Sequence, residues 1–176
     1  LIDCFAGIGT RFLADKKVDH VIFSFHGLPE RQVKKTDLTQ SHCLMKNSCC
    51  ESFSMANPDC YRAHSFKTAQ LIAEKMGLPP KKYSVAFQSR LGRTPWIRPY
   101  TDALYDELPK RGIERVAVMT PSFVADCLET LEEIEMRGRE QFIAAGGKEL
   151  HLVPSLNSED HWADALIQIL QPLIEK

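Results

Sequence analysis

Short runs of apolar residues alternate along the chain with longer amphipathic stretches. The short runs are apolar at odd and even positions alike, which is typical of strands buried on both faces of a parallel sheet. They cover residues 20–25, 83–88, 115–120 and 150–153. The amphipathic stretches predict helices over residues 4–16, 61–76, 99–110, 126–145 and 158–174. In the helix over 126–145 we expect a buried stripe formed by Leu128, Leu131 and Ile134.

The order of these elements predicts the fold class. Strands and helices alternate, which is the layout of a doubly wound α/β domain. We therefore expect one domain over residues 1–176, with a mainly four-stranded parallel sheet and helices on both faces. Ligands in such folds bind outside the carboxyl ends of the strands. The segments that follow the strands are therefore the first candidates for a functional site.

One irregular segment, residues 28–60, interrupts this alternation, and it far exceeds the ~2–6 residues that usually join a strand to a helix. It contains four of the six cysteines: Cys43, Cys49, Cys50 and Cys60. Clustered thiols without a secretion signal indicate metal ligands in a reducing compartment. The paired knuckles of zinc sites are missing, and adjacent cysteines fit a two-iron cluster more easily than one tetrahedral ion. Unliganded cysteines are the alternative, and His42 is a further candidate ligand.

Composition narrows the function classes. The formal net charge is −1 at pH 7, so the bulk composition offers no attraction to nucleic acid or anionic lipid. No apolar run approaches the ~18–20 residues of a membrane-spanning helix, although a shallow contact with a membrane surface stays open. The chain begins at Leu1, which we interpret as the interior of a longer open reading frame. We expect a cytoplasmic protein.

The first strand ends at a histidine. In the segment SFHGLP, His26 lies where the strand stops, Gly27 permits a turn, and Pro29 prevents the strand from continuing. A neutral imidazole in this position could accept protons or bind a metal. The alternative is a histidine that only caps the strand end by hydrogen bonding.

A polar loop follows the second strand, at the same edge of the expected sheet. Arg90, with Gln88 and Ser89, could bind carboxylates. Trp96 could stack on a flat aromatic ligand. The alternative is an exposed loop that Trp96 anchors to the core. The position of the loop favours contact with a ligand.

The longest predicted helix opens with carboxylates, directly after the third strand. Glu129 and Glu133 are four residues apart and therefore share one helix face. Two stacked carboxylates can pass on a divalent cation or accept protons. The alternative is the favourable placement of acids near a helix N-terminus. Cys127, in the same helix, is expected to be a small buried side chain, as is Cys4.

Four segments together resemble the ferrochelatase family of class II-type chelatases. They are SFHGLPER, FQSRLGRTPWIRPYTD, PSFVADCLETLEEIE and AAGGKELHLVPSLN, in this order along the chain. Members pair two similar α/β halves of Rossmann type around a porphyrin cleft, and this chain is similar to the C-terminal half. Its insertion resembles that of bacterial members with an internal [2Fe–2S] site. The cluster ligands that this resemblance implies are Cys43, Cys49, Cys50 and Cys60.

The resemblance also implies roles for the other candidate residues. His26 matches the catalytic histidine and Glu129 the essential acid that faces it across the porphyrin, both beside the substrate Fe²⁺. Glu133 matches the next acid in a proton or metal path. The loop that matches the porphyrin-contacting segment contains Gln88, Ser89, Arg90 and Trp96. Two positions depart from many members: Cys127 stands in place of a histidine, and Arg137 ends the acidic row.

The implied reaction is the insertion of Fe²⁺ into protoporphyrin IX to form protohaem, the last step of haem biosynthesis. The implied partners are a porphyrin, ferrous iron and the N-terminal half of the same enzyme, so this chain alone is expected to be weakly active or inactive. Three alternatives remain: a cobalt or nickel chelatase for another tetrapyrrole, a non-catalytic tetrapyrrole-binding module, and an iron–sulfur-holding domain. A peripheral membrane contact is compatible with each of them.

Overall fold

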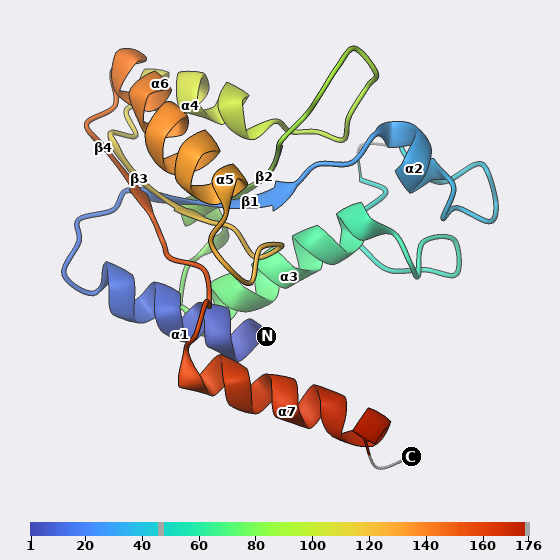
Figure 1. The fold of residues 1–176 in the computed structure, drawn as a ribbon. Helices are drawn as coiled ribbons and strands as arrows, with labels where there is room; N and C mark the ends of the chain where they lie inside the picture. The colour runs from blue at the N-terminus through green and yellow to red at the C-terminus, as the bar shows by residue number, and fades with distance from the viewer. Residues whose placement is uncertain (46–47, 175–176) are drawn as a thin grey trace.

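The computed structural model describes residues 1–45 and 48–174. Its centre is a four-stranded parallel sheet with the strand order β2-β1-β3-β4 (Figure 1). The strands are β1 (His20–His26), β2 (Tyr83–Gln88), β3 (Arg115–Met119) and β4 (Glu149–Leu152). Each strand lies within one residue of its expected bounds. The predicted fold class and the predicted strands are thereby confirmed.

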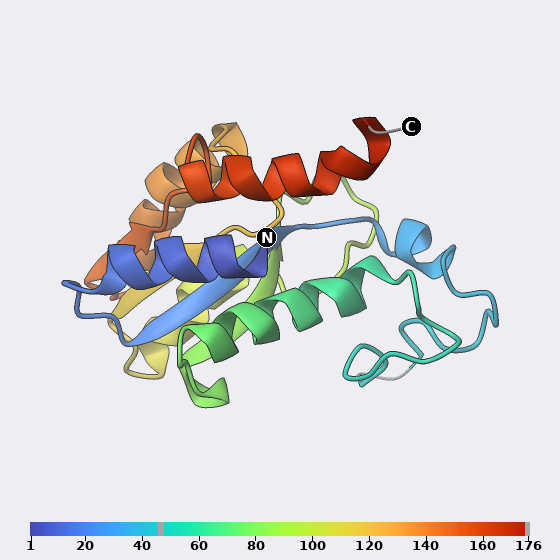
Figure 2. The same ribbon diagram turned by 90° about the horizontal axis from the view of Figure 1, so that it is seen from below.

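Helices cover both faces of the sheet. One side carries α1 (Ile2–Leu13), α3 (Tyr61–Lys75) and α7 (Asp160–Ile174) (Figure 2). The other carries α4 (Thr101–Lys110), α5 (Leu128–Thr130), the π-helix η2 (Leu131–Gly138) and α6 (Arg139–Ala144). Successive side chains of a strand point to opposite faces, so β1 places Phe23 and Phe25 in one apolar core and Ile22 in the other. The sheet is thus buried on both faces, as the apolar runs predict.

The helix predicted over residues 126–145 begins later than expected, at Leu128. Asp126 stays outside it because its carboxylate is engaged elsewhere. That carboxylate accepts hydrogen bonds from Ser155 N (3.2 Å) and Asn157 Nδ2 (2.8 Å), in the segment after β4. The start of the helix is therefore tied to the end of the neighbouring strand.

The middle of this helix, η2, is π-helical. Its i→i+5 hydrogen bonding gives each turn more residues than an α-helical turn. The residues that face the core are accordingly four positions apart: Thr130, Ile134 and Gly138. Leu128 is 77 % exposed and Leu131 is 44 % exposed. The predicted apolar stripe is therefore wrong at these two positions and confirmed at Ile134.

Local hydrogen bonds hold together the cysteine-rich segment, residues 28–60. After the short helix α2 (Glu30–Lys34), the buried Asp37 carboxylate accepts hydrogen bonds of 2.7–2.9 Å from the backbone N–H groups of Thr39, His42 and Cys43. Further along, the buried Asn57 amide donates to the carbonyl oxygens of Cys49 (3.0 Å) and Ser52 (2.9 Å). The described residues of this segment, 28–45 and 48–60, are therefore fixed by local hydrogen bonds, and α2 is the one regular element among them.

The last helix, α7, has an exposed apolar surface. Trp162 is its buried residue, and the second half of the helix extends away from the body of the molecule (Figures 1 and 2). The exposed aliphatic side chains are Leu166, Ile167, Ile169, Leu170, Leu173 and Ile174. Within the part of the chain that the structure describes, no helix has the length and apolar character needed to cross a membrane.

Candidate functional site

His26 is the last residue of β1, and hydrogen bonds fix both its backbone and its ring. Its N–H donates to Ser122 Oγ (2.8 Å), and its carbonyl oxygen accepts from the Tyr61 hydroxyl (2.7 Å). Ring atom Nδ1 lies 2.6 Å from the carbonyl oxygen of Gly27. A carbonyl oxygen can only accept, so Nδ1 carries the proton in the neutral ring and Nε2 has a free lone pair. That lone pair can accept a proton or bind a metal ion.

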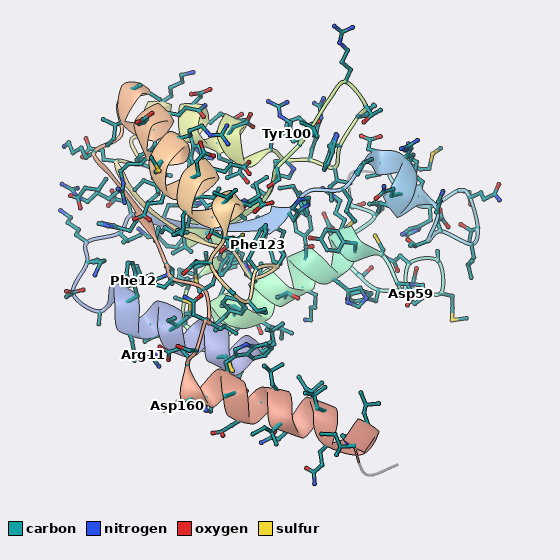
Figure 3. All side chains as sticks on the ribbon, in the orientation of Figure 1. Arg11, Phe12, Asp59, Tyr100, Phe123 and Asp160 are labelled. Carbon is teal, nitrogen blue, oxygen red and sulfur yellow. The ribbon has the colours of Figure 1, made fainter. Side chains whose placement is uncertain are left out.

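Aromatic rings flank this imidazole. The ring centroids of Phe123 and Trp96 lie 6.0 Å and 6.4 Å from that of His26. Phe123 comes from the segment between β3 and α5, close to the strand ends (Figure 3). Glycine is needed at position 27, because a Cβ there would lie 2.8 Å from Gln88 O and 3.1 Å from the Trp96 ring. The imidazole therefore lies among close-packed aromatic groups at the carboxyl edge of the sheet.

Glu129, in α5, is the acid that is electrostatically coupled to this histidine. A hydrogen bond from the Cys127 thiol is the main cause that lowers the pKa of its carboxyl group, and attraction to His26 lowers it further. Glu129 is thus ionised at neutral pH. Cys127 caps the helix and is half-buried, so its predicted burial is wrong, whereas Cys4 is buried as expected.

Glu133 is held against the end of β2. Ser89 donates its backbone N–H to Glu133 Oε1 (2.8 Å) and its hydroxyl to Oε2 (2.7 Å). Ser89 adopts a left-handed backbone conformation with φ of +64°, which is uncommon for a residue with a side chain. The carboxylates of Glu129 and Glu133 therefore have different environments. The first is attracted electrostatically by His26, and the second accepts two hydrogen bonds from Ser89.

The remaining candidates after β2 are engaged within the protein. Gln88 is 3 % exposed, and its amide is hydrogen-bonded at both ends. Arg90 Nη2 donates to Asp102 Oδ2 (2.5 Å), and its guanidinium lies 4.4 Å from the centroid of Tyr100. Trp96 Nε1 donates to a carbonyl oxygen of its own loop (3.0 Å). Ser89 thus lies beside Glu133, and Trp96 lies beside His26. Arg90 is bound to Asp102 of α4.

A cavity of about 270 Å³ lies behind Glu133, between the end of β2, α4 and η2. Arg137 and Tyr105 also line it. The Tyr105 hydroxyl is buried and has no hydrogen-bond partner among the described residues. Burial raises its pKa, and the negative charge of Glu133 contributes. Sequence reasoning missed Tyr105, because a tyrosine on the apolar face of a predicted helix is indistinguishable from an ordinary core residue.

The four cysteines of the insertion are buried, free and close together. The sulfurs of Cys49 and Cys50 are 3.6 Å apart. A hydrogen bond between the thiols of Cys50 and Cys60 raises the pKa of Cys50 and lowers that of Cys60. Burial raises the pKa of the Cys43 thiol to about 11.

These thiols do not converge on a single ion. Within residues 1–45 and 48–174, no group of three or more His, Cys, Asp or Glu side chains is arranged to hold a metal ion. The ring of His42 is directed at the backbone, because its Nε2 lies 3.1 Å from the carbonyl oxygen of Cys49. The predicted gathering of thiols is present, but the present arrangement does not fit a metal centre.

Comparisons with known proteins identify the family. The profile of the ferrochelatase family matches residues 1–173. The chain is 56 % identical over 154 residues to a ferrochelatase of Pseudomonas fluorescens (strain Pf0-1). The aligned residues cover 87 % of the chain and 45 % of that relative. It is 53 % identical over 152 residues to ferrochelatases of Stutzerimonas stutzeri and Azotobacter vinelandii, again over 86 % of the chain and 45 % of each relative. The chain spans a little under half the length of these relatives, and it belongs to the ferrochelatase family.

Proposed function

We propose that this chain is the C-terminal half of a cytoplasmic enzyme that inserts Fe²⁺ into protoporphyrin IX to form protohaem. The observation that carries the proposal is the pairing of His26, whose Nε2 lone pair is free, with the ionised carboxylate of Glu129. Both residues lie at the carboxyl edge of a parallel sheet, where ligands bind in such folds. Membership of the ferrochelatase family supports the same chemistry.

Insertion replaces two pyrrole protons by one ferrous ion. The Nε2 lone pair of His26 either accepts a pyrrole proton or holds the incoming Fe²⁺, since both roles use the same lone pair. The carboxylate of Glu129 supplies negative charge close by, which favours the cation and the departing protons. Imidazole and carboxylate ligands hold ferrous iron less tightly than a set of thiolates would. The iron can therefore leave them for the pyrrole nitrogens.

We assign Glu133 to the removal of the pyrrole protons. Ser89 holds its carboxylate beside the cavity that the Tyr105 hydroxyl also lines. A polar cavity of this size, partly open to solvent, can hold water molecules that relay protons. In this proposal protons pass from the vicinity of Glu129 to Glu133 and leave through the cavity.

The porphyrin lies against the loop after β2. Trp96, next to His26, offers a flat aromatic surface for the macrocycle. Ser89 lies in the same loop, where it holds the carboxylate of Glu133. Arg90 is exposed, and its guanidinium can exchange the Asp102 carboxylate for a porphyrin propionate of the same chemistry.

The other half of the enzyme covers α7. The chain matches only 45 % of its relatives' length, and α7 exposes six large aliphatic side chains. Exposed apolar surface of this extent marks an interaction site. The N-terminal half would cover this surface and supply the second wall of the porphyrin cleft. We therefore expect the chain alone to insert iron weakly or not at all.

A [2Fe–2S] cluster on Cys43, Cys49, Cys50 and Cys60 belongs to the same proposal. The support is that four buried, free thiols are gathered in one insertion. They would have to rearrange to hold a cluster, which would supply a structural or redox centre away from His26. Anaerobically purified protein would then absorb between about 400 and 600 nm and contain iron and acid-labile sulfide in equal amounts. A colourless protein without iron or sulfide would remove the cluster and leave the rest of the proposal intact.

The deciding experiment uses the full-length enzyme. His26→Ala should abolish anaerobic formation of protohaem from Fe²⁺ and protoporphyrin IX, while thermal unfolding and porphyrin binding stay close to wild type. Normal turnover of this variant would overturn the assignment. Wild-type enzyme that prefers Co²⁺ or Ni²⁺ to Fe²⁺ would point instead to a chelatase for another metal.

A further inference from the structure

We infer that Gln88 is a positioning residue that fixes Glu129 relative to His26, and that Ser24 and Thr101 orient its amide. This inference rests on the proposed function for the chemistry, but its structural basis is independent of it. The predicted role of Gln88 was direct contact with the porphyrin. Its 3 % exposure and its hydrogen bonds favour a role inside the protein.

Gln88 is bonded to both sides of the site. In the β1–β2 register it is the partner of His26, and its backbone carbonyl accepts the N–H of Gly27 at 2.8 Å. Its side-chain Nε2 donates to the backbone carbonyl of Glu129 at 2.6 Å. One residue therefore links the strand that ends at the histidine to the helix that begins with the acid.

The direction of each hydrogen bond behind Gln88 can be derived. The carbonyl oxygen of Glu129 can only accept, so Nε2 must face it and Oε1 must face the other way. Oε1 lies 2.7 Å from Ser24 Oγ, which must then donate its single proton there. Ser24 Oγ also lies 2.7 Å from Thr101 Oγ1, so the Thr101 hydroxyl donates to Ser24.

The result is a directed chain of hydrogen bonds from α4 through β1 and β2 to α5. Thr101 and Ser24 are 2 % and 0 % exposed, so neither can reach a substrate. In such chains each bond polarises the next, and every member has its partner. Rotation of the Gln88 amide by 180° would place its oxygen against the Glu129 carbonyl oxygen and break that hydrogen bond, and both hydroxyls would have to reverse their donation. The Glu129 carbonyl selects this orientation of the amide, and the two hydroxyls support it by giving Oε1 a donor.

The test compares variants of the full-length enzyme. Gln88→Met keeps a similar volume but removes both hydrogen bonds, and Ser24→Ala removes only the orienting hydroxyl. Ser84→Ala is the matched control, because the Ser84 hydroxyl pairs with His20 (2.8 Å) between the same two strands, at their opposite end. Initial rates are measured with Fe²⁺ and protoporphyrin IX varied separately. Hydrogen exchange of the amides of residues 127–133 is measured on the same variants.

Gln88→Met should lower kcat by about 10- to 100-fold, as is typical for residues that orient a metal-binding group, without changing the KM for porphyrin. Ser24→Ala should act in the same direction but less strongly, and should add little to Gln88→Met, because the two residues act through one contact. Exchange of residues 127–133 should be faster in both variants and unchanged in Ser84→Ala.

Two results would overturn the inference. One is a higher porphyrin KM for Gln88→Met with an unchanged kcat, which would make Gln88 a substrate contact. The other is a Ser24→Ala enzyme that matches Ser84→Ala in both rate and exchange. If the wild-type enzyme forms no protohaem, the proposed function fails, and the exchange data still decide whether Gln88 positions Glu129.

Discussion

The site at the strand ends and the cysteine-rich insertion both bury polar side chains, but they connect them differently. In the site, Gln88 joins Ser24 and Glu129, which lie 64 and 41 residues away in the sequence. In the insertion, Asp37 and Asn57 bind groups two to eight residues away. The geometry of the site thus depends on the whole sheet, whereas the buried polar groups of the insertion are bound locally.

The largest expected effect comes from the core beneath the site. Phe87 is buried and packs against Phe25 and Phe66. Phe87→Ala should lower the free energy of unfolding by about 3–5 kcal/mol, because it leaves a cavity. Urea unfolding followed by circular dichroism measures this loss. Hydrogen exchange should then accelerate around His26 and Glu129 together, and acceleration at one of them alone would contradict the shared dependence on the sheet.

Removal of a local anchor should affect the insertion alone. Asn57→Ala deletes the hydrogen bonds to the carbonyls of Cys49 and Ser52 and should ease local opening by about 1–3 kcal/mol. Hydrogen exchange should be faster across residues 49–60 and unchanged around His26. Asp59→Ala, at an exposed position of the same segment, is the control. Faster exchange at the strand ends would show that the two regions are coupled.

The amino end of the sheet has a pH dependence of its own, which comes from His20. Burial lowers the pKa of His20 to about 4, and the positive charges of Arg111 and Lys82 add to this. Between pH 6.5 and 4 the unfolded chain therefore binds a proton that the folded chain does not, so stability falls as the pH falls. His20 is 4 % exposed, and the loss that it causes should be about 1–3 kcal/mol. Urea unfolding at both pH values should show a smaller loss for His20→Gln than for wild type.

The smallest effect is expected on the exposed face of η2. Arg137 pairs with Glu132 at 2.6 Å, but both side chains are largely in solvent. Arg137→Ala should therefore change the free energy of unfolding by less than about 0.5 kcal/mol. A thermal melt checks this value. A loss of unfolding free energy comparable to that of Asn57→Ala would mean that the Arg137–Glu132 pair contributes to the structure of the site.

The hydrophobic pattern predicted the sheet well because its strands are buried on both faces. Val21, Ile22 and Phe23 leave no polar position that could suggest another element. The pattern failed where hydrogen bonds decide the backbone. The side chain of Asp126 is drawn to the segment after β4, which delays the helix and places Cys127 at its cap.

The reactive groups of the site were predictable, but their supports were not. His26 ends a strand, Glu129 opens the helix after another, and both have side chains with recognisable chemistry. Ser24 and Tyr61 hold the site through partners that are 64 and 35 residues away. A serine in an apolar strand or a tyrosine at a helix start carries no periodic signal of such a contact. The role of Gln88 could be inferred only once the register of β1 and β2 was known.

The number of residues in the π-helix η2 sets how the residues before it are rotated around the helix axis relative to those after it. Deletion of one residue from it would let the segment close as an α-helix, in which each residue turns about 100° around the axis. Arg139 would then take the place of Gly138, where even a Cβ atom would lie 2.9 Å from the ring of Tyr105. The length of this segment is therefore as constrained as its composition. Insertion or deletion of one residue would rotate Glu129 and Glu133 around the helix axis relative to the packed residues that follow.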